Sequence, residues 1–195
     1  MQGADEIRRF YELKKGAGTY PDKRRAGFLL KKMTYKDFLE SKIELATESG
    51  FIADPAAVNK VLKPHQRDAV VWALKGGRRA LFESFGLGKT VQEIEFCHLA
   101  AEHRGGRALI VLPLGVKQEF THDAVEVLGY EKPEYCRTMK EVEQSISQIV
   151  LTNYERVRDG DIRPDYFAAT SLDEASVLRS FGSKTYQTFL DKFKN

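Results

Sequence analysis

The sequence has little cysteine and no long apolar run. Among its 195 residues there are two cysteines, Cys97 and Cys136, and four histidines without zinc-site spacing. Two thiols this far apart form neither a disulfide framework nor a metal knuckle, so we expect core or near-surface thiols in a reducing compartment. No apolar run approaches the ~20 residues that span a bilayer. The polar start Met1–Glu6 lacks the apolar core of a signal peptide. We therefore expect a cytoplasmic protein without a membrane partner.

The excess of positive charge lies at the N-terminus. Residues 1–33 carry nine Lys or Arg against four Asp or Glu, whereas residues 34–195 carry 22 against 24. Such an arm can contact nucleic-acid phosphates, because each contact releases counterions. A solvated, partly disordered extension explains the same composition. We treat residues 1–33 as a basic arm and residues 34–195 as the working domain.

Apolar periodicity and glycine or proline breaks predict an alternation of strands and helices. The continuous apolar run Ala108–Leu112, closed by Pro113, is typical of a buried parallel strand. Alternating strands and helices favour a three-layer α/β domain with a parallel sheet, here with an N-terminal helical extension. The expected strands are 79–82, 108–112, 135–137, 149–153 and 168–172. The expected helices are 5–15, 34–50, 66–74, 116–128, 141–147 and 186–195, with one more of about 14 residues that starts at Lys89 and ends near Gly105.

The stretch Glu83–Thr90 has the composition of a phosphate-binding loop between a strand and a helix. Its glycines, Gly86 and Gly88 around Leu87, allow backbone N–H groups to approach phosphate oxygens. Lys89 supplies a positive charge at a helix N-terminus, and the Thr90 hydroxyl is a potential Mg²⁺ ligand. Glu83 occupies the position where the full consensus has another glycine. A glycine turn with a solvated lysine is the simpler alternative.

Two adjacent carboxylates, Asp173 and Glu174, follow the last expected strand. A phosphate loop needs an acidic partner at the end of another strand to hold Mg²⁺ and position a water. Asp173 would contact the metal, and Glu174 would orient and deprotonate the attacking water. An acidic loop after a strand is the alternative, and Thr170 and Ser171 make that strand more polar than a central strand usually is.

Five segments in this order resemble superfamily-two helicases and translocases, especially the Swi/Snf-like branch. Segment 86–92 is similar to motif I, and 173–176, a DEAS variant of DEAH, is similar to motif II. Leu62–Gln66, with Trp72, resembles the adenine-recognising glutamine motif. Leu112–Val116 resembles motif Ia, and Leu151–Glu155 resembles the TNYE segment. The continuation Val177–Thr185 is most similar to phage and prophage helicases, which implies a bacterial or phage-infected host cell.

The resemblance implies a first RecA-like, ATP-binding motor domain with ATP and Mg²⁺ as ligands and nucleic acid, most often DNA, as partner. Gln66 would read the adenine. Gly86, Leu87, Gly88, Lys89 and Thr90 would bind the phosphates, and Thr90 and Asp173 would hold Mg²⁺. Lys89, Asp173 and Glu174 would be catalytic. Because the sequence stops shortly after motif II, we expect the second RecA-like domain to be supplied in cis or by a partner. The chain alone would then bind ATP and hardly hydrolyse it. The rival interpretation is a non-catalytic module that binds nucleotide or nucleic acid and acts through a partner protein.

Overall fold

The computed structural model describes residues 48–84, 86–180 and 182–193. The chain divides into two units, Met1–Thr47 and Glu48–Asn195, and the description below concerns the second. The predicted basic arm and N-terminal helical extension lie outside the described residues, as does nearly all of the helix expected at 34–50. No helix within the described ranges is both long and apolar enough to cross a membrane.

The centre of the domain is a four-stranded sheet in which every pair of neighbours is parallel. Its strands are β1 (Ala108–Val111), β2 (Glu134–Tyr135), β3 (Ile149–Thr152) and β4 (Ala169–Leu172). The order across the sheet is β2-β3-β1-β4. β1 and β3 are buried along their whole length, whereas β4 is half-buried. The carboxyl ends of all four strands therefore meet at one edge, where α/β proteins bind ligands.

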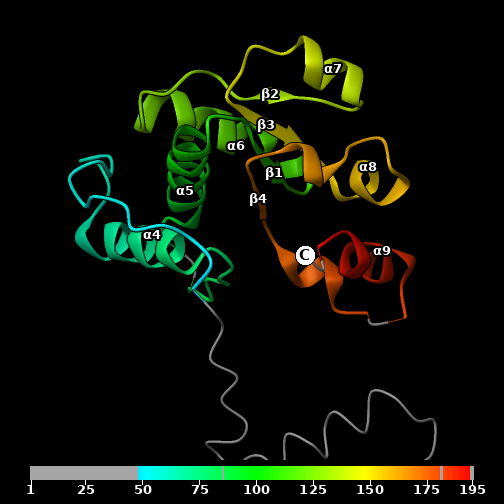
Figure 1. Cartoon of the computed structure of the whole chain (residues 1–195), viewed down its shortest axis with the longest axis horizontal. Coiled ribbons are helices and arrows are strands. Elements are labelled where there is room, and N and C mark those ends of the chain that lie inside the picture. Colours follow the sequence, from blue (N-terminus) through cyan, green and yellow to red (C-terminus); the bar gives the residue numbers. More distant parts are fainter. Residues whose placement is uncertain (1–47, 85, 181, 194–195) are drawn as a thin grey trace, which may run out of the picture. The chain divides into compact units, whose positions relative to one another are not determined.

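Helices connect the strands and cover both faces of the sheet (Figure 1). The α-helices are α4 (Pro64–Gly76), α5 (Lys89–Arg104), α6 (Lys117–His122), α7 (Met139–Gln144), α8 (Tyr154–Asp159) and α9 (Lys184–Lys192). Short 3₁₀ turns are η1 (Leu114–Val116), η3 (Pro164–Tyr166) and η4 (Ala175–Leu178), and η2 (Asp123–Val127) is a π-helical continuation of α6. The helix expected at 116–128 is thus a run of three helical types.

The hydrophobic core has two halves, one on each face of the sheet. Alternate residues of β1 point to opposite faces, as the pleat requires. Ala108 and Ile110 pack in the half that contains α4, α5 and α6, and Leu109 and Val111 pack in the half that contains α7, α8 and α9. The two faces together make the three-layer α/β arrangement that the alternation predicted, with both cysteines buried in it.

The expected strand at 79–82 is wrong. These residues have no regular secondary structure, and Phe82 is 97% exposed. A strand is stable only when a neighbour satisfies its backbone groups, and within the described ranges 79–82 make no backbone–backbone hydrogen bond. A short apolar run could not reveal this, because its composition does not say which strand would pair with it.

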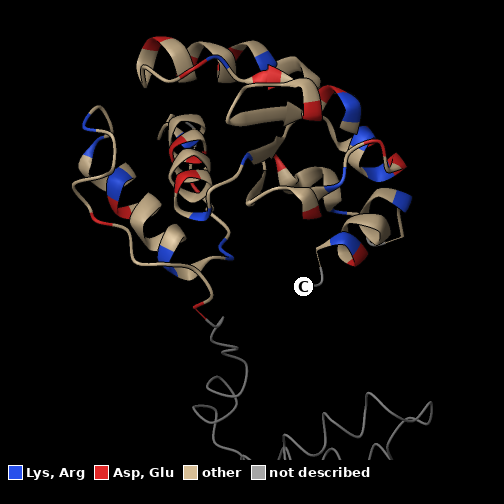
Figure 2. Ribbon diagram, turned by 45° about the horizontal axis from the view of Figure 1, so that its top comes forward, with Lys and Arg blue, Asp and Glu red and all other residues tan. Residues whose placement is uncertain are grey.

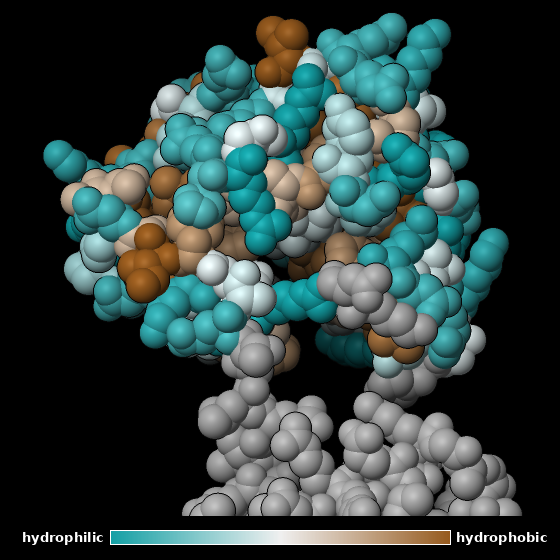
Figure 3. Space-filling model, in the orientation of Figure 1, coloured by the Kyte–Doolittle hydropathy of each residue, from teal (hydrophilic) through white to brown (hydrophobic). Residues whose placement is uncertain are grey.

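The surface of the described domain is mostly polar. On the face in Figure 3 hydrophilic residues predominate, and the most apolar side chains are separate spots. Figure 2 shows basic and acidic residues interspersed over the described ribbon. This agrees with the near-balanced charge of residues 34–195 in the sequence.

Candidate nucleotide-binding site

The described part of the phosphate loop has the backbone that its glycines allow. Gly86 and Gly88 have φ angles of +80° and +76°, in the left-handed region that favours glycine. Gly88 is the N-cap of α5, and a Cβ added to it would lie 2.3 Å from Nε2 of Gln66. Glycine is therefore favoured at position 88 by the backbone angle, and a side chain there would displace the Gln66 amide.

Buried amide side chains brace this loop. Gln66, in the first turn of α4, donates from Nε2 to the Leu87 carbonyl oxygen at 2.8 Å. Gln92 of α5 is fully buried and donates to the Glu83 carboxylate at 2.9 Å. The Lys89 ammonium donates to the Glu83 carbonyl oxygen at 3.1 Å. Glu83, which stands where the consensus has glycine, thus holds the loop to α5 through two different groups.

Gln66 is only 7% exposed, so it is a buried residue of α4 and not a water-exposed one. Its Oε1 accepts from the Lys63 backbone N–H at 2.8 Å, which gives the N-cap of α4 a partner for its backbone donor. An amide has two N–H donors and two acceptor lone pairs, so one of each is left after these two bonds. The adenine-reading role of Gln66 stays a prediction, and its contact with Leu87 places it beside the loop.

The N-terminus of α5 is a favourable place for an anion. Its cap, Gly88, offers no side-chain acceptor, and no acidic residue lies in the first turn. The first N–H groups of a helix have no partner within the helix, and their partial positive charge favours phosphate. Lys89 and Thr90 open this helix, as the sequence predicted.

The acidic pair lies at the carboxyl end of β4. The Asp173 backbone N–H donates to the Val111 carbonyl oxygen of β1 at 2.9 Å, which continues the sheet ladder to the acid. Asp173 is half-buried and Glu174 is exposed. The Ser176 hydroxyl donates a hydrogen bond to the Glu174 carboxylate. The serine of the DEAS segment therefore holds the carboxylate that would act on water.

Uncompensated negative charge gathers around Asp173. Burial raises the pKa of Asp173, and the charges of Glu174 and Glu119 raise it further, while a backbone hydrogen bond and Lys89 oppose the rise. Burial and the charge of Asp173 raise the pKa of Glu93 from 4.5 to about 8, against a hydrogen bond with Ser171. Of these influences on the pKa of Asp173, the positive charge of Lys89 is the smallest.

Two acidic residues near the loop, Glu119 and Glu93, were not predicted from the sequence. Thr90 Oγ1 lies 3.4 Å from Oε1 of Glu119, an acid in α6, which follows β1. Glu93 lies one turn along α5 from Lys89, and its buried Oε1 has no hydrogen-bond partner within the described residues. Glu119 could have been suspected from its place after a buried strand. Glu93 could have been suspected because it lies on α5, the helix that the loop begins, and because Ser171 is a polar residue of β4 that can bond to it.

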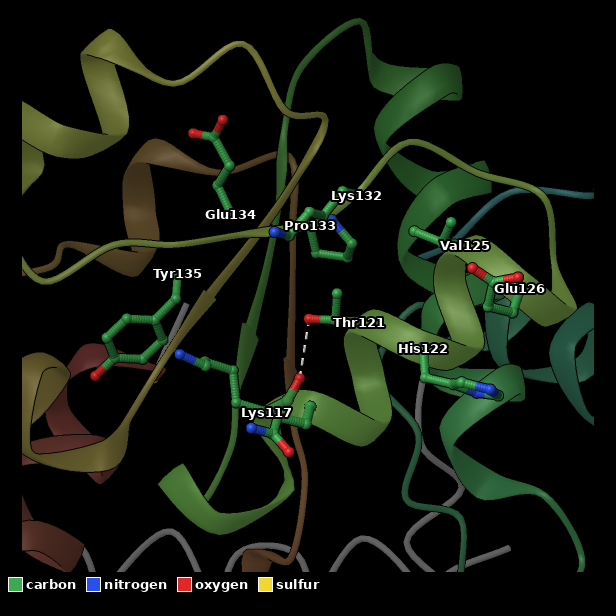
Figure 4. A pocket seen from close by; sticks show the side chains of 10 residues that line it. Lys117, Thr121, His122, Val125, Glu126, Lys132, Pro133, Glu134 and Tyr135 are labelled. Carbon is green, nitrogen blue, oxygen red and sulfur yellow. Dashed lines mark hydrogen bonds between the residues drawn. The ribbon is translucent and has the colours of Figure 1, made fainter.

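A separate groove lies between α6 and the segment before β2 (Figure 4). Its basic residues, Lys117 and Lys132, are offset by Glu126 and Glu134 on the same walls. Lys117 directs its ammonium group over the Tyr135 ring, 5.3 Å from the ring centre. None of the predicted site residues lines this groove. It is therefore distinct from the candidate nucleotide site.

Comparison with known proteins places the fold. No protein-family model and no curated protein matches the sequence. The described structure is similar to the SWI2/SNF2 ATPase core of Sulfolobus solfataricus, solved in complex with double-stranded DNA, with a TM-score of 0.53 and 17% identity over 71% of this chain and 31% of that one. It is also similar to the UvsW helicase of bacteriophage T4, with a TM-score of 0.57 and 17% identity over 98% of this chain and 66% of that one.

The chain spans less than a third of the first of these structures and just under two thirds of the second. The first is a SWI2/SNF2 ATPase core and the second is a helicase, which agrees with the resemblance that the five segments indicated. The parallel sheet, its covering helices and these two similarities together confirm the α/β prediction. The described chain has a RecA-like α/β fold similar to that of these two structures.

Proposed function

We propose that this chain is the ATP-binding, N-terminal motor domain of a DNA-dependent ATPase or helicase-like translocase. The observation that carries the proposal is the placement of Lys89 at the start of α5 and of Asp173 directly after β4, with α5 packed against β4. A phosphate-binding loop and a carboxylate that meet at the carboxyl edge of a parallel sheet are what ATP hydrolysis requires. The similarity of the fold to an ATPase core and to a helicase supports the same conclusion.

Each residue has a role set by its place. Gly86, Leu87 and Gly88 present backbone N–H groups to the phosphates, with Lys89 as the cation and the N-terminus of α5 behind it. Gln66, whose amide bonds to the Leu87 carbonyl oxygen, would read the adenine. Glu174, exposed and held by Ser176, would orient the attacking water and accept its proton. Asp173 would face the metal.

The residues fit ATP with Mg²⁺. Magnesium keeps several of its waters and binds proteins through one or two carboxylates together with substrate phosphates, so Asp173 and the Thr90 hydroxyl are a sufficient donor set. The pKa of Asp173 is raised first by burial and then by the negative charges of Glu174 and Glu119, and a bound cation would offset those charges. When bound, Mg²⁺ supplies charge neutralisation at the phosphate oxygens.

Phosphoryl transfer also needs a cation on the far side of the phosphate, and such an arginine is worth ~10³–10⁵ in rate. Lys89 comes from the loop side. We therefore propose that the chain binds ATP and hardly hydrolyses it until a second RecA-like domain, in cis or from a partner, supplies that cation. The double-stranded DNA bound to the Sulfolobus ATPase core supports DNA as the nucleic-acid partner.

The test is calorimetric titration with ATP and MgCl₂, followed by steady-state phosphate release with and without DNA. We expect ATP binding, and turnover near background for both the unmodified chain and Glu174→Gln. A chain that binds no ATP but still binds DNA or a protein would favour the rival, a non-catalytic binding module. DNA-stimulated turnover of about 1 s⁻¹ or more that is lost in Glu174→Gln would contradict the proposed need for a second domain.

A further inference from the structure

A buried tyrosine reaches the acidic pair from the opposite half of the core. Tyr154 is the first residue of α8, directly after β3 and Asn153, and is 3% exposed. Its hydroxyl donates to the backbone carbonyl oxygen of Asp173 at 2.6 Å. This hydrogen bond joins two segments that the sequence analysis singled out separately, the TNYE segment and the DEAS segment.

The bonded carbonyl belongs to a peptide unit with an unusual backbone. Glu174 has a φ of +52°, and it is the one non-glycine residue of the described ranges with a positive φ. Left-handed backbone is unfavourable for a residue with a Cβ, and it persists only where the surroundings hold it. The Asp173 carbonyl and the Glu174 N–H lie in the same peptide plane. A group that fixes this carbonyl therefore also restricts the φ angle of Glu174.

Tyr154 is itself held firmly enough to do this. Its ring packs against Phe189 of α9, with ring centres 5.3 Å apart, in the half of the core that contains α7, α8 and α9. Burial and the nearby carboxylates of Asp173, Glu93 and Glu174 raise the pKa of its hydroxyl, so it remains a donor at neutral pH. The orientation of the acidic pair thus depends on packing between α8 and α9.

We propose that Tyr154 is a positioning residue for the catalytic carboxylates: its hydroxyl sets the Asp173–Glu174 peptide plane, so that Asp173 faces the metal and Glu174 faces the water. The inference deepens the proposed function and rests on it. It assigns a task to the tyrosine of the TNYE segment that does not involve contact with nucleic acid. It also makes the α8–α9 pair a support of the ATP site.

The test compares Tyr154→Phe with Tyr166→Phe in the full chain. Both variants lose one hydroxyl and keep the ring, and Tyr166 is a suitable control because it is half-exposed in η3 and packs edge-on against Phe167. The first readout is the backbone amide resonance of Glu174 in a ¹⁵N-labelled sample without nucleotide. The second is the ratio of ATP affinities measured with MgCl₂ and with EDTA, which isolates the metal-dependent part of binding.

We expect Tyr154→Phe to shift or broaden the Glu174 resonance and to lower the Mg²⁺-dependent ratio about three- to tenfold, the range for loss of one hydrogen bond. Tyr166→Phe should change neither. An unchanged resonance and ratio in Tyr154→Phe would overturn the inference, as would an equal loss of affinity with and without Mg²⁺, which denotes a merely structural role. If the unmodified chain binds no ATP, the proposed function fails, and the Glu174 resonance still decides whether Tyr154 sets this peptide.

Discussion

The two sides of the candidate site are built in different ways. The phosphate side, residues 83–90, is held by neutral amides and by its own lysine: Gln66, Gln92 and Lys89 all bond to backbone or carboxylate groups of the loop. The carboxylate side has an excess of negative charge. Asp173 interacts with Glu174, Glu119 and Glu93, and the pKa values of Asp173 and Glu93 are raised.

The difference indicates which side has the greater need of a cation. The phosphate side is held by hydrogen bonds from Gln66, Gln92 and Lys89 and presents a helix N-terminus to an anion. The carboxylate side carries unbalanced negative charge and a left-handed residue, so it is the side that a cation would stabilise. We expect substitutions on the phosphate side to change nucleotide affinity. Substitutions on the carboxylate side should change how nucleotide affinity depends on metal and how stability depends on pH.

The largest expected effect is that of Lys89→Ala on the phosphate side. This change removes a charge-assisted contact worth about 1.5–3 kcal/mol, so ATP affinity should fall at least tenfold. Calorimetry with ATP and MgCl₂ measures it. Lys140→Ala, at an exposed position of α7, is the matched control and should bind as the unmodified chain does. Equal affinities for the Lys89 variant and the unmodified chain would show that the loop does not bind phosphate.

The second prediction concerns pH and the carboxylate side. Because the pKa of Glu93 rises from 4.5 to about 8 on folding, between these values the folded chain holds a proton that the unfolded chain has lost. Stability should therefore fall as pH rises through this window, by about 1 kcal/mol per pH unit. Urea unfolding between pH 5.5 and about 7.5, without metal or nucleotide, measures the slope.

In Glu93→Gln the fall of stability with rising pH that Glu93 causes should disappear. Glu143→Gln, at an exposed position of α7, should show the same fall as the unmodified chain. The groups that face Glu93 are Asp173 and Ser171, with Cys97 and Tyr154 also within its electrostatic reach. Parallel pH profiles for the unmodified chain and Glu93→Gln would mean that Glu93 is ionised in the folded chain.

The smallest expected effect separates two roles of Gln66. If Gln66 reads the base, ATP should bind better than GTP, and Gln66→Ala should narrow that gap about threefold, which corresponds to one neutral hydrogen bond. If Gln66 only supports the loop through its bond to Leu87, Gln66→Ala should lower the affinities for ATP and GTP equally. Gln118→Ala, at an exposed position of α6, controls for loss of an amide. Equal ATP and GTP affinities in the unmodified chain would exclude base reading.

The parts of the fold that the sequence predicted are those with a strong local pattern. β1 and β3 are continuous apolar runs, and α5 begins at a glycine loop and ends at Gly105, so each element is bounded by its own residues. The prediction of a strand at 79–82 failed because a strand also needs a neighbouring strand to pair with, and the segment's own residues do not show whether one is present. The short helix α8 was missed because its six residues carry too little periodicity to detect.

In the site, the predicted loop and acidic pair lie where motif order placed them, and their partners were not predictable. The hydrogen bond of Gln66 to Leu87 and that of Tyr154 to Asp173 join residues 21 and 19 positions apart. The burial that raises the pKa of Glu93 depends on packing of α5 against β4. Such contacts arise from tertiary structure, and no local pattern encodes them.

The central claim is that Lys89 and Asp173 belong to one ATP·Mg²⁺ site. Its most direct test is a double-mutant cycle of ATP affinity in MgCl₂ for the unmodified chain, Lys89→Ala, Asp173→Asn and the double variant. Residues of one site are coupled, so the double variant should bind markedly better than the sum of the two single losses predicts. Losses that add within about 0.5 kcal/mol, the expectation for independent sites, would contradict the claim.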